Sequence, residues 1–263
     1  MKVALTIAGS DSGGGAGIQA DLKTFQQFGV FGTSVIVALT AQNTTGVRAV
    51  HTVPAEIVEA QLDALAEDLP PDAVKTGMLA DAPLVALVAA AIRVRRWSPY
   101  VLDPVMVASS GDPLLDPAAI ALVRSELLPL ATLVTPNLDE AELLAGRTVR
   151  DPAEMERAGQ ILVALGAGAA LIKGGHLERG TLTDVLVTSS ATYRFEHERL
   201  DTRATHGTGC TLSAAITAGL ARGDDLMRSV TTALDYVHRA IAAAPGLGRG
   251  RGPLHHGVPA DQP

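Results

Sequence analysis

The sequence predicts an α/β fold, a three-layer α/β/α sandwich around a mostly parallel central sheet. Three observations support this prediction. Short aliphatic runs alternate with longer helical patterns along the whole chain. Hydrophobic residues make up 47% of the sequence but aromatic residues only 3%, so the core must be aliphatic, as in a buried parallel sheet. No internal repeat or long linker divides the 263 residues, which predicts a single domain over 1–263.

The expected elements follow from the periodicity and from turn residues between the runs. Strands are predicted at Val3–Ala8, Ser34–Thr40, Tyr100–Leu102, Leu133–Val134, Asp184–Thr188 and Thr192–His197, and from Ala73 and Ala169 onward. Helices are predicted at Ile18–Phe28, Pro54–Leu69, Asp81–Arg95, Asp151–Leu165 and Asp225–Ala244, and after Asp116, Asn137 and Cys210. Several of these helices begin at an aspartate that can cap free N–H groups. The tail from about residue 246 is rich in Gly, Pro and His and is expected to be loosely ordered.

Composition excludes several classes of protein. The net charge is −7 and no basic block appears, which argues against a nucleic-acid partner. The longest unbroken apolar run, Leu84–Ile92, is far shorter than the roughly 18 residues that a membrane-spanning helix needs. The single cysteine excludes an internal disulfide and suits a reducing compartment. We therefore expect a cytoplasmic protein without a membrane or nucleic-acid partner.

The segment Thr205–Cys210 is the most informative part of the chain. Gly207, Thr208 and Gly209 precede the only cysteine, and an apolar helix follows. The free N–H groups and the dipole at a helix start attract anions, and glycines let the backbone approach a phosphate closely. The same field predicts a pKa for Cys210 below the free value of about 8.5. The segment therefore suggests phosphoryl transfer to a hydroxyl, with a glycine-rich turn and a buried structural cysteine as the alternative.

A second glycine-rich segment, Gly9–Gly17, lies between a predicted strand and a predicted helix. It is not a dinucleotide fingerprint, because Ile18 stands where the third glycine would be. It is not a phosphate-binding P-loop either, because Lys23 is preceded by Leu22 rather than by glycine. Two interpretations stay open: backbone that passes close over a flat ligand, or a flexible turn.

Polar residues follow several of the predicted strands. Gln42 offers amide donors and an acceptor that suit the edge of a heterocycle, or it bonds local backbone. Asp103 ends a buried strand at the sheet edge where ligands bind. Asn137 and Glu140 have the spacing of a helix cap, and Glu140 could also lie near a magnesium ion. Lys173 could reach a phosphate or extend into solvent.

With these motifs in order, the sequence resembles the ribokinase-like small-molecule kinases. Among them it is most similar to the hydroxymethylpyrimidine and phosphomethylpyrimidine kinases of thiamine biosynthesis. The similarity extends from Ala4 to about His256. The motifs that carry it are Ala8–Asp21, Thr40–Thr44, Lys75–Leu79, Asp103–Met106, Thr135–Asn137 with Glu140 and Ala141, Lys173–His176, and Thr205–Thr211.

The resemblance implies an enzyme that uses ATP and Mg²⁺ on a small pyrimidine, and that forms a homodimer. In such an enzyme Gln42 would bond the aminopyrimidine, and Met78 and Val105 would line its pocket. Cys210 would stand where most relatives carry an aspartate base. The remaining site residues implied are Gly9 and Asp21 for the substrate, Lys173, Thr205 and Asn137 for the nucleotide, Glu140 and Asp103 for the metal, and Gly207, Thr208 and Gly209 for the transferred phosphoryl group.

Two other functions stay open. The same scaffold phosphorylates pyridoxine-type vitamins, and turnover on pyridoxal would distinguish that activity. A pyrimidine sensor without catalysis is the second alternative. A sensor is expected to have lost the base and the metal residue, whereas Cys210 and Glu140 are both present.

Overall fold

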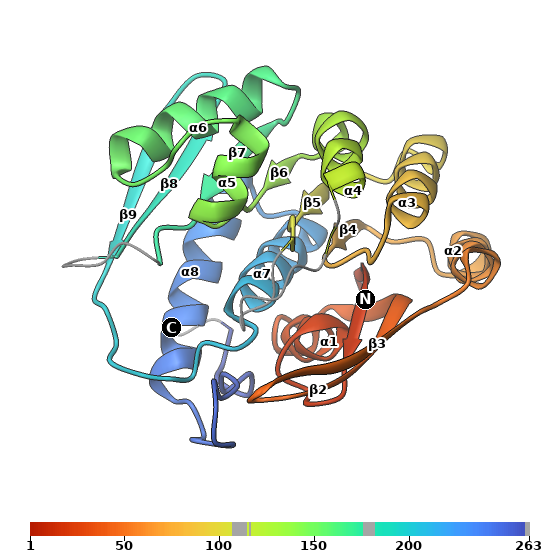
Figure 1. Cartoon of the computed structure of the whole chain (residues 1–263), viewed down its shortest axis with the longest axis horizontal. Coiled ribbons are helices and arrows are strands. Elements are labelled where there is room, and N and C mark those ends of the chain that lie inside the picture. Colours follow the sequence, from red (N-terminus) through yellow and green to blue (C-terminus); the bar gives the residue numbers. More distant parts are fainter. Residues whose placement is uncertain (107–114, 116, 176–181, 261–263) are drawn as a thin grey trace.

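A computed structural model of the chain describes residues 1–106, 115, 117–175 and 182–260, so that Asp116 and His176 lie outside the described residues. Its described strands form a single nine-stranded sheet in the order β3-β2-β1-β4-β5-β6-β7-β8-β9 (Figure 1). The strands are β1 (Val3–Asp11), β2 (Phe31–Asn43), β3 (Gly46–Thr52), β4 (Ala73–Thr76), β5 (Tyr100–Leu102), β6 (Leu133–Val134), β7 (Ala169–Ile172), β8 (Leu182–Thr188) and β9 (Thr192–His197). The strands from β2 to β7 in this order run parallel, and β3, β8 and β9 are antiparallel to their neighbours.

Helices cover both faces of the sheet (Figure 1). One layer consists of α1 (Gly17–Gln27), α7 (Thr208–Arg222) and α8 (Leu226–Ala242). The other consists of α2 (Ala55–Asp68), α3 (Ala82–Arg95), α4 (Pro117–Leu122), α5 (Leu138–Ala145) and α6 (Pro152–Ala164), with short helical turns at Val123–Leu127 and Leu128–Leu130. This arrangement confirms the three-layer prediction.

Two apolar cores lie between the layers, one on each face of the sheet. Successive strand residues alternate between them, as the pleat of a strand requires. In β5, Tyr100 and Leu102 belong to the core beneath α2–α6, whereas Val101 packs into the core beneath α1, α7 and α8. Both cores are almost entirely aliphatic, which agrees with the low aromatic content.

The structure differs from the sequence prediction at β3. This edge strand pairs with β2 in an antiparallel hairpin, and its residues from Arg48 to Thr52 are exposed. Because no face of it is buried, β3 lacks the apolar alternation by which a strand is recognised.

The C-terminal tail also differs from its prediction, because residues 246–260 pack on the body instead of lying loose. Leu254, His256 and Ala260 are buried. His255 N donates to Ala240 O of α8 at 3.0 Å, and the Tyr236 hydroxyl donates to His256 O at 2.8 Å. The apolar and histidine side chains of the tail therefore complete the core beneath α8.

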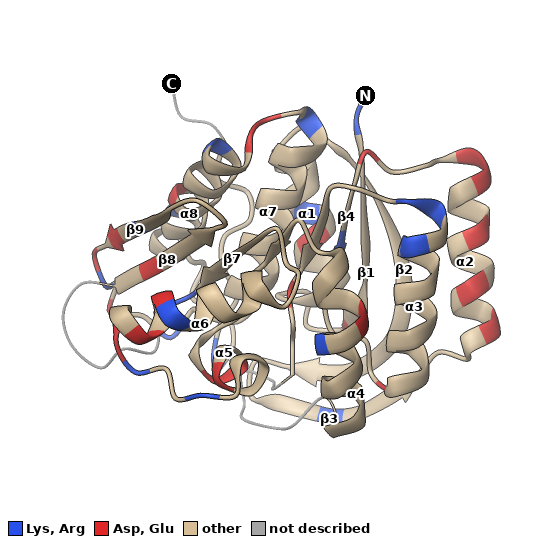
Figure 2. Cartoon of the chain, turned by 90° about the horizontal axis from the view of Figure 1, so that it is seen from above, with Lys and Arg blue, Asp and Glu red and all other residues tan. Residues whose placement is uncertain are grey.

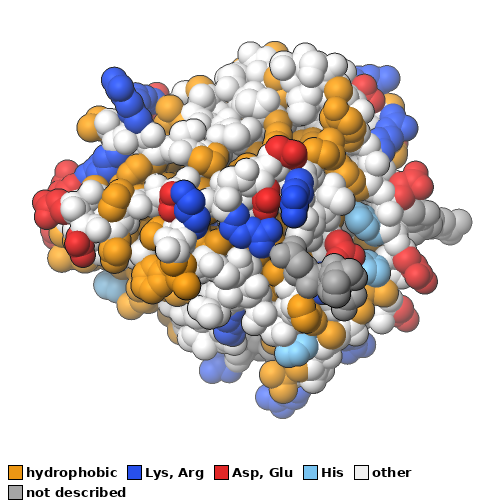
Figure 3. All heavy atoms as spheres, turned by 180° about the vertical axis from the view of Figure 1, so that it is seen from behind, with side chains coloured by type: hydrophobic (Ala, Val, Ile, Leu, Met, Phe, Trp, Pro, Cys, Tyr) orange, Lys and Arg blue, Asp and Glu red, His pale blue; other side chains and the backbone are white. Residues whose placement is uncertain are grey.

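Charged side chains lie mainly on the outer surface. Acidic residues follow the exposed side of α2 (Figure 2): Glu56, Glu59, Asp63, Glu67 and Asp68. The face shown in Figure 3 carries Lys and Arg interspersed with Asp and Glu rather than one continuous basic patch. Among the described helices, none is long and apolar enough to cross a membrane.

His256 makes the stability of this fold dependent on pH. His256 is 6% exposed and its Nε2 lies 3.0 Å from Thr211 Oγ1. Burial lowers the pKa of His256 to about 4, and the positive charges of Lys23 and His255 add to this effect. Between pH 6.5 and 4, His256 is therefore protonated in the unfolded chain but stays neutral in the folded chain. The free energy of unfolding should fall through this range by up to about 3 kcal/mol on this account.

Urea unfolding of wild type and His256→Gln at pH 7, 6, 5 and 4 measures this contribution. Glutamine keeps an amide near Thr211 but does not titrate, so its loss of stability below pH 6.5 should be smaller. Identical pH dependence in the two proteins would contradict the assignment to His256.

Candidate active site

A cavity of about 1190 Å³ opens at the carboxyl ends of the parallel strands. In open α/β sheets this edge is where ligands bind, since the loops there are free to vary. All the site residues expected from the sequence line this single cavity: Gly9, Asp21, Gln42, Met78, Asp103, Val105, Asn137, Glu140, Lys173, Thr205, Gly207, Thr208, Gly209 and Cys210. The structure thus brings together residues that the sequence spreads over some two hundred positions.

The start of α7 forms one wall of the cavity. Gly207, the residue before this helix, has a left-handed backbone (φ 84°). A Cβ added to Gly207 would lie 1.8 Å from the carbonyl oxygen of Gly15, so only glycine fits. The first bond of the helix runs from Thr211 N to Gly207 O (2.8 Å), which leaves the N–H groups of Gly209 and Cys210 without partners inside the helix. These amides can bind the oxygens of a phosphoryl group.

The pKa of Cys210 differs in direction from the sequence prediction. Burial raises the pKa of the thiol to about 12. The charge of Lys75 and a hydrogen bond from Gly17 N–H lower it, whereas Asp21 and Asp103 raise it. The prediction was wrong because it counted the attraction of the helix start and omitted the cost of removing a thiolate from water. Cys210 is therefore a neutral thiol in the ligand-free protein at pH 7.

A buried ion pair lies beneath the cavity. Lys75 Nζ donates to Asp21 Oδ1 at 2.7 Å, and both side chains are fully buried. Thr6 Oγ1 donates to the other oxygen, Asp21 Oδ2, at 2.6 Å. Asp21 therefore lines the cavity as the partner of Lys75. Sequence reasoning missed Lys75, although a lysine within the apolar strand Ala73–Thr76 is a signal, because a charge is buried only when it is paired.

A second cation, Lys173, lies among carboxylates at the far end of the cavity. Its Nζ is 3.2 Å from Asp103 Oδ1 and 4.0 Å from Glu140 Oε2. Asp103 also accepts bonds from Ser213 Oγ (3.0 Å) and Thr135 Oγ1 (3.3 Å). Burial by itself would raise the pKa of Asp103, but the charges of Lys173 and Lys75 and the hydrogen bonds from Lys173 and Ser213 together outweigh it and lower the pKa.

Asn137 and Glu140 form the capping box that their spacing predicted. Asn137 Oδ1 accepts from Glu140 N at 2.9 Å, and Glu140 Oε2 accepts from Asn137 N at 2.8 Å. Burial raises the pKa of Glu140 to about 7; Lys173 opposes this rise, and the charge of Asp103 adds to it. Glu140 thus caps α5 and also faces a second carboxylate across the cavity.

The opposite end of the cavity is lined by Gln42 and apolar groups. Gln42 Oε1 accepts from Thr40 Oγ1 at 3.2 Å, whereas its Nε2 has no hydrogen-bond partner among the described residues. Met78 packs on Gly9 so closely that a Cβ there would lie 2.6 Å from Met78 Cε. Together with Val105, these groups give this part of the cavity an apolar lining beside one free amide donor.

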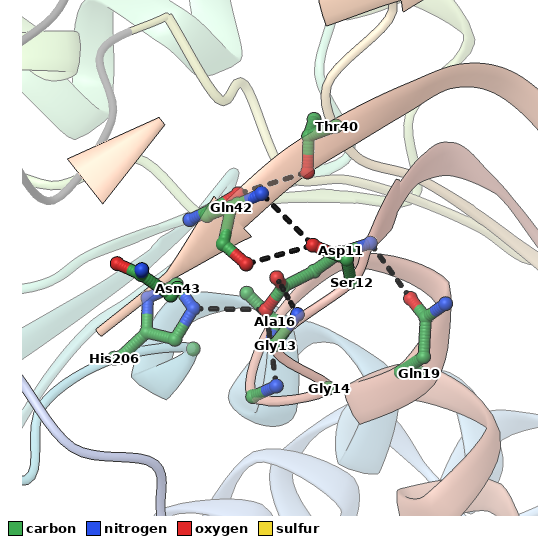
Figure 4. A network of polar contacts seen from close by, with 12 residues as sticks. Asp11, Ser12, Gly13, Gly14, Ala16, Gln19, Thr40, Gln42, Asn43 and His206 are labelled. Atoms are coloured by element: carbon green, nitrogen blue, oxygen red, sulfur yellow. Dashed lines mark hydrogen bonds and ion pairs between the residues drawn. The ribbon is translucent and has the colours of Figure 1, made fainter. Parts of the chain in front are cut away.

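Two further residues of the wall had no role in the sequence prediction. Asp11 and His206 come from distant segments and meet at 2.9 Å between Oδ2 and Nε2 (Figure 4). The segment 198–203 and Arg251 of the tail also line the cavity. No sequence signal marks these pairings, because each depends on how distant segments are folded together.

Comparison with known proteins agrees with this geometry. Residues 11–255 match the family described as phosphomethylpyrimidine kinase. A hydroxymethylpyrimidine/phosphomethylpyrimidine kinase of Rhizobium meliloti is 55% identical over 257 residues, which cover 97% of this chain and 96% of the relative. A pyridoxal kinase of Bacillus subtilis, solved in complex with ADP, has a TM-score of 0.92 at 38% identity over 97% of both chains.

A pyridoxal kinase from Staphylococcus aureus, solved with AMP-PCP and pyridoxal, has a TM-score of 0.91 at 33% identity and covers 98% of this chain and 94% of that one. These structural neighbours confirm the ribokinase-like fold. The sequence match is higher to the pyrimidine kinase than to either pyridoxal kinase and extends over nearly the whole length of both chains. The chain belongs to the phosphomethylpyrimidine kinase family.

Proposed function

We propose that this chain transfers the terminal phosphoryl group of ATP to hydroxymethylpyrimidine and then to its monophosphate, as a step of thiamine biosynthesis. The observation that carries the proposal is the shared cavity. Its lining includes the free Gln42 amide with Met78 and Val105, the cation of Lys173, and Gly209 and Cys210 with their free amides. The 55% identity to a kinase named for both pyrimidines supports the same substrates.

For the nucleotide, we propose that Lys173 contacts the phosphates and that Thr205 and Asn137 line its path. Phosphoryl transfer has little covalent work for a protein to do, so positioning and charge stabilisation carry it. The sequence resemblance implies the amides of Gly207, Thr208 and Gly209 for this role, but Thr208 N donates to Thr205 O at 3.4 Å. The amides of Gly207, Gly209 and Cys210 would therefore stabilise the charge that grows on the transferred group.

Asp103 and Glu140 would hold Mg²⁺ together with nucleotide phosphates. Among the described residues, no group of three or more His, Cys, Asp and Glu side chains is placed to bind a metal alone. Mg²⁺ in kinases commonly takes only one or two carboxylates and completes its shell with phosphates and water. The two carboxylates repel one another, which raises the pKa of Glu140 beyond the effect of burial, and a bound cation would relieve that repulsion. When bound, Mg²⁺ would neutralise charge on the phosphates.

A coupled assay of ADP release by the purified chain tests the proposed function. ADP should appear with hydroxymethylpyrimidine and with its monophosphate, and omission of Mg²⁺ should abolish both signals. Release no greater than the background with either pyrimidine would show that the assignment is wrong.

Pyridoxal is the second candidate acceptor. Two pyridoxal kinases have TM-scores of 0.91 and 0.92 with this chain, so their backbone fold is closely similar to that of this chain. Including pyridoxal in the same assay compares the acceptors directly. We expect a higher kcat/KM for hydroxymethylpyrimidine than for pyridoxal. A higher kcat/KM for pyridoxal would make pyridoxal the preferred acceptor.

Gln42 is proposed to bond the pyrimidine edge. A site that hydrogen-bonds a substrate group loses affinity heavily when its own partner group is removed. The Gln42→Leu variant should therefore raise the KM for hydroxymethylpyrimidine while the KM for ATP stays nearly constant. Steady-state kinetics with each substrate varied in turn measures both constants. An unchanged KM for hydroxymethylpyrimidine would contradict this role and leave Gln42 only its hydrogen bond with Thr40.

Cys210 is proposed to accept the proton of the substrate hydroxyl. A general base contributes on the order of 10²–10⁴ in rate, so Cys210→Ala and Cys210→Ser should lose about that much turnover on hydroxymethylpyrimidine. Cys210→Asp keeps a proton acceptor and should retain more. Hydroxymethylpyrimidine monophosphate, the second acceptor, is a phosphate monoester with a second pKa of about 6, so its phosphate is already deprotonated at pH 8. It needs no base, and Cys210→Ala should therefore lose much less turnover with this acceptor.

The pKa of about 12 adds a test by pH. Below that pKa the thiolate fraction grows about tenfold per pH unit, so turnover of hydroxymethylpyrimidine should rise with pH in wild type and stay flatter in Cys210→Asp. A packing role predicts Ala and Ser variants near the wild-type rate and a destabilised Asp variant, because a buried charge is costly. Turnover and thermal midpoints of the three variants separate the two roles.

We also propose a homodimer in the cytoplasm. The exposed edge of β3 is a ready surface for pairing with another chain, and Leu39 and Val50 of the β2–β3 hairpin are about half exposed. A lone cysteine suits the reducing cytoplasm. Light scattering of the purified chain should give twice the monomer mass of 27.1 kDa, and a monomer mass would contradict the dimer.

A further inference from the structure

The carboxylate of Asp11 organises the glycine-rich loop that follows β1 (Figure 4). Oδ1 accepts from Gly13 N at 2.7 Å. Oδ2 accepts from Gly15 N at 3.0 Å and from Ala16 N at 2.9 Å. One buried side chain therefore fixes three amides of a loop that would otherwise be free to change shape.

The same carboxylate reaches a segment 195 residues away. His206 Nε2 lies 2.9 Å from Asp11 Oδ2, and His206 stands directly before Gly207. Burial opposes the ionisation of Asp11, but its bonds from His206, Gly13 and Ala16 outweigh it and lower its pKa. Asp11 is therefore a carboxylate at neutral pH, which accepts but cannot donate, so Nε2 must be the donor.

The contact between the two segments leaves little room for adjustment. A Cβ on Gly15 would lie 2.7 Å from the His206 ring, and one on Gly207 would lie 1.8 Å from Gly15 O. On its other side, His206 N donates to Gly252 O of the tail at 3.1 Å. The glycine-rich loop, the start of α7 and the tail thus meet at one histidine.

Two groups of the reaction site depend on this junction. The loop held by Asp11 ends at Gly17, whose backbone N–H lowers the pKa of the Cys210 thiol. The segment held by His206 leads into the free amides of Gly209 and Cys210 at the start of α7. Asp11 and His206 line the same cavity as Gln42 and Met78, but both Asp11 oxygens already accept from His206 or from backbone amides. We therefore expect their effect on the reaction to pass through the backbone.

We propose that Asp11 and His206 are a positioning pair that sets the distance and orientation between the glycine-rich loop and the phosphoryl-binding start of α7. This inference rests on the proposed role of the Gly207–Cys210 segment in phosphoryl transfer. Its physical basis is the steep dependence of transfer rates on alignment, where a misplacement of about 1 Å can cost about 10²-fold. The pair therefore acts on kcat more than on ground-state binding.

Four variants test the pair: His206→Leu, His206→Gln, Asp11→Asn and the double variant Asp11→Asn/His206→Leu. Leucine removes the donor, and glutamine restores an N–H at nearly the same reach. His255→Leu is the matched control for the same substitution. His255 is an exposed histidine of the C-terminal tail and lies outside the active-site cavity. Each protein is assayed at saturating ATP and hydroxymethylpyrimidine, with KM values and thermal midpoints measured in parallel.

The His206→Leu variant should lose about 10- to 100-fold in kcat with KM values close to wild type. His206→Gln should recover most of that loss, and the control should match wild type. Once Asn stands at position 11, removal of the histidine should have little further effect, since the two residues act as one unit.

Three results would overturn the pair: wild-type kcat in His206→Leu, no recovery in His206→Gln, or losses that multiply in the double variant. Cys210→Ala keeps this outcome separate from the proposed function. If Cys210→Ala is impaired while His206→Leu is not, only the positioning pair fails. If wild type releases no ADP with either pyrimidine, the proposed function itself fails.

Discussion

The buried ion pair between Lys75 and Asp21 is the interaction on which the site depends. It joins β4 to α1, and through Thr6 it also joins β1. Removing one partner from a fully buried pair typically costs about 3–5 kcal/mol, because the remaining charge has neither water nor a counter-ion. The pair therefore fixes α1 against the sheet where the glycine-rich loop ends, and it places a cation whose field reaches the Cys210 thiol.

Charge in the cavity is arranged as balanced pairs. Lys75 is held by Asp21, and Lys173 is held by Asp103 with Glu140 close by. Each cation is thereby kept protonated and in place without a bound anion. In the proposed reaction, an entering phosphate would meet cations already oriented, together with backbone amides at the start of α7, so little reorganisation would be needed when charge develops during transfer.

Much of this arrangement is predictable from sequence because parallel strands end at one edge. Asp103, Asn137 and Lys173 each follow a buried apolar run, and the sheet brings them together without further information. The capping box of Asn137 and Glu140 is equally local, since its spacing alone defines it.

The remaining features depend on contacts that spacing does not encode. Asp21, the partner of Lys75, is 54 residues away in the sequence. Predicting this pair would require knowing which face of α1 packs against the sheet. The pKa of Cys210 depends on how completely other segments exclude water, so the helix start by itself predicts the wrong direction. The tail and β3 escaped prediction for opposite reasons: the tail is polar in composition yet packed, and β3 is ordered yet exposed.

The layer formed by α1, α7 and α8 has a consequence for the order in which the molecule can be assembled. Asp11 is synthesised 195 residues before His206, and α1 has no neighbours in its own layer until α7 and α8 exist. A chain emerging from the ribosome can therefore form the opposite layer early, but one face of its sheet stays uncovered until late in translation. Contacts of such long sequence separation also slow folding. The nascent protein thus passes through a stage in which an apolar sheet face is open to chaperones or to aggregation, and its site can be completed only after α7 and α8 have been synthesised.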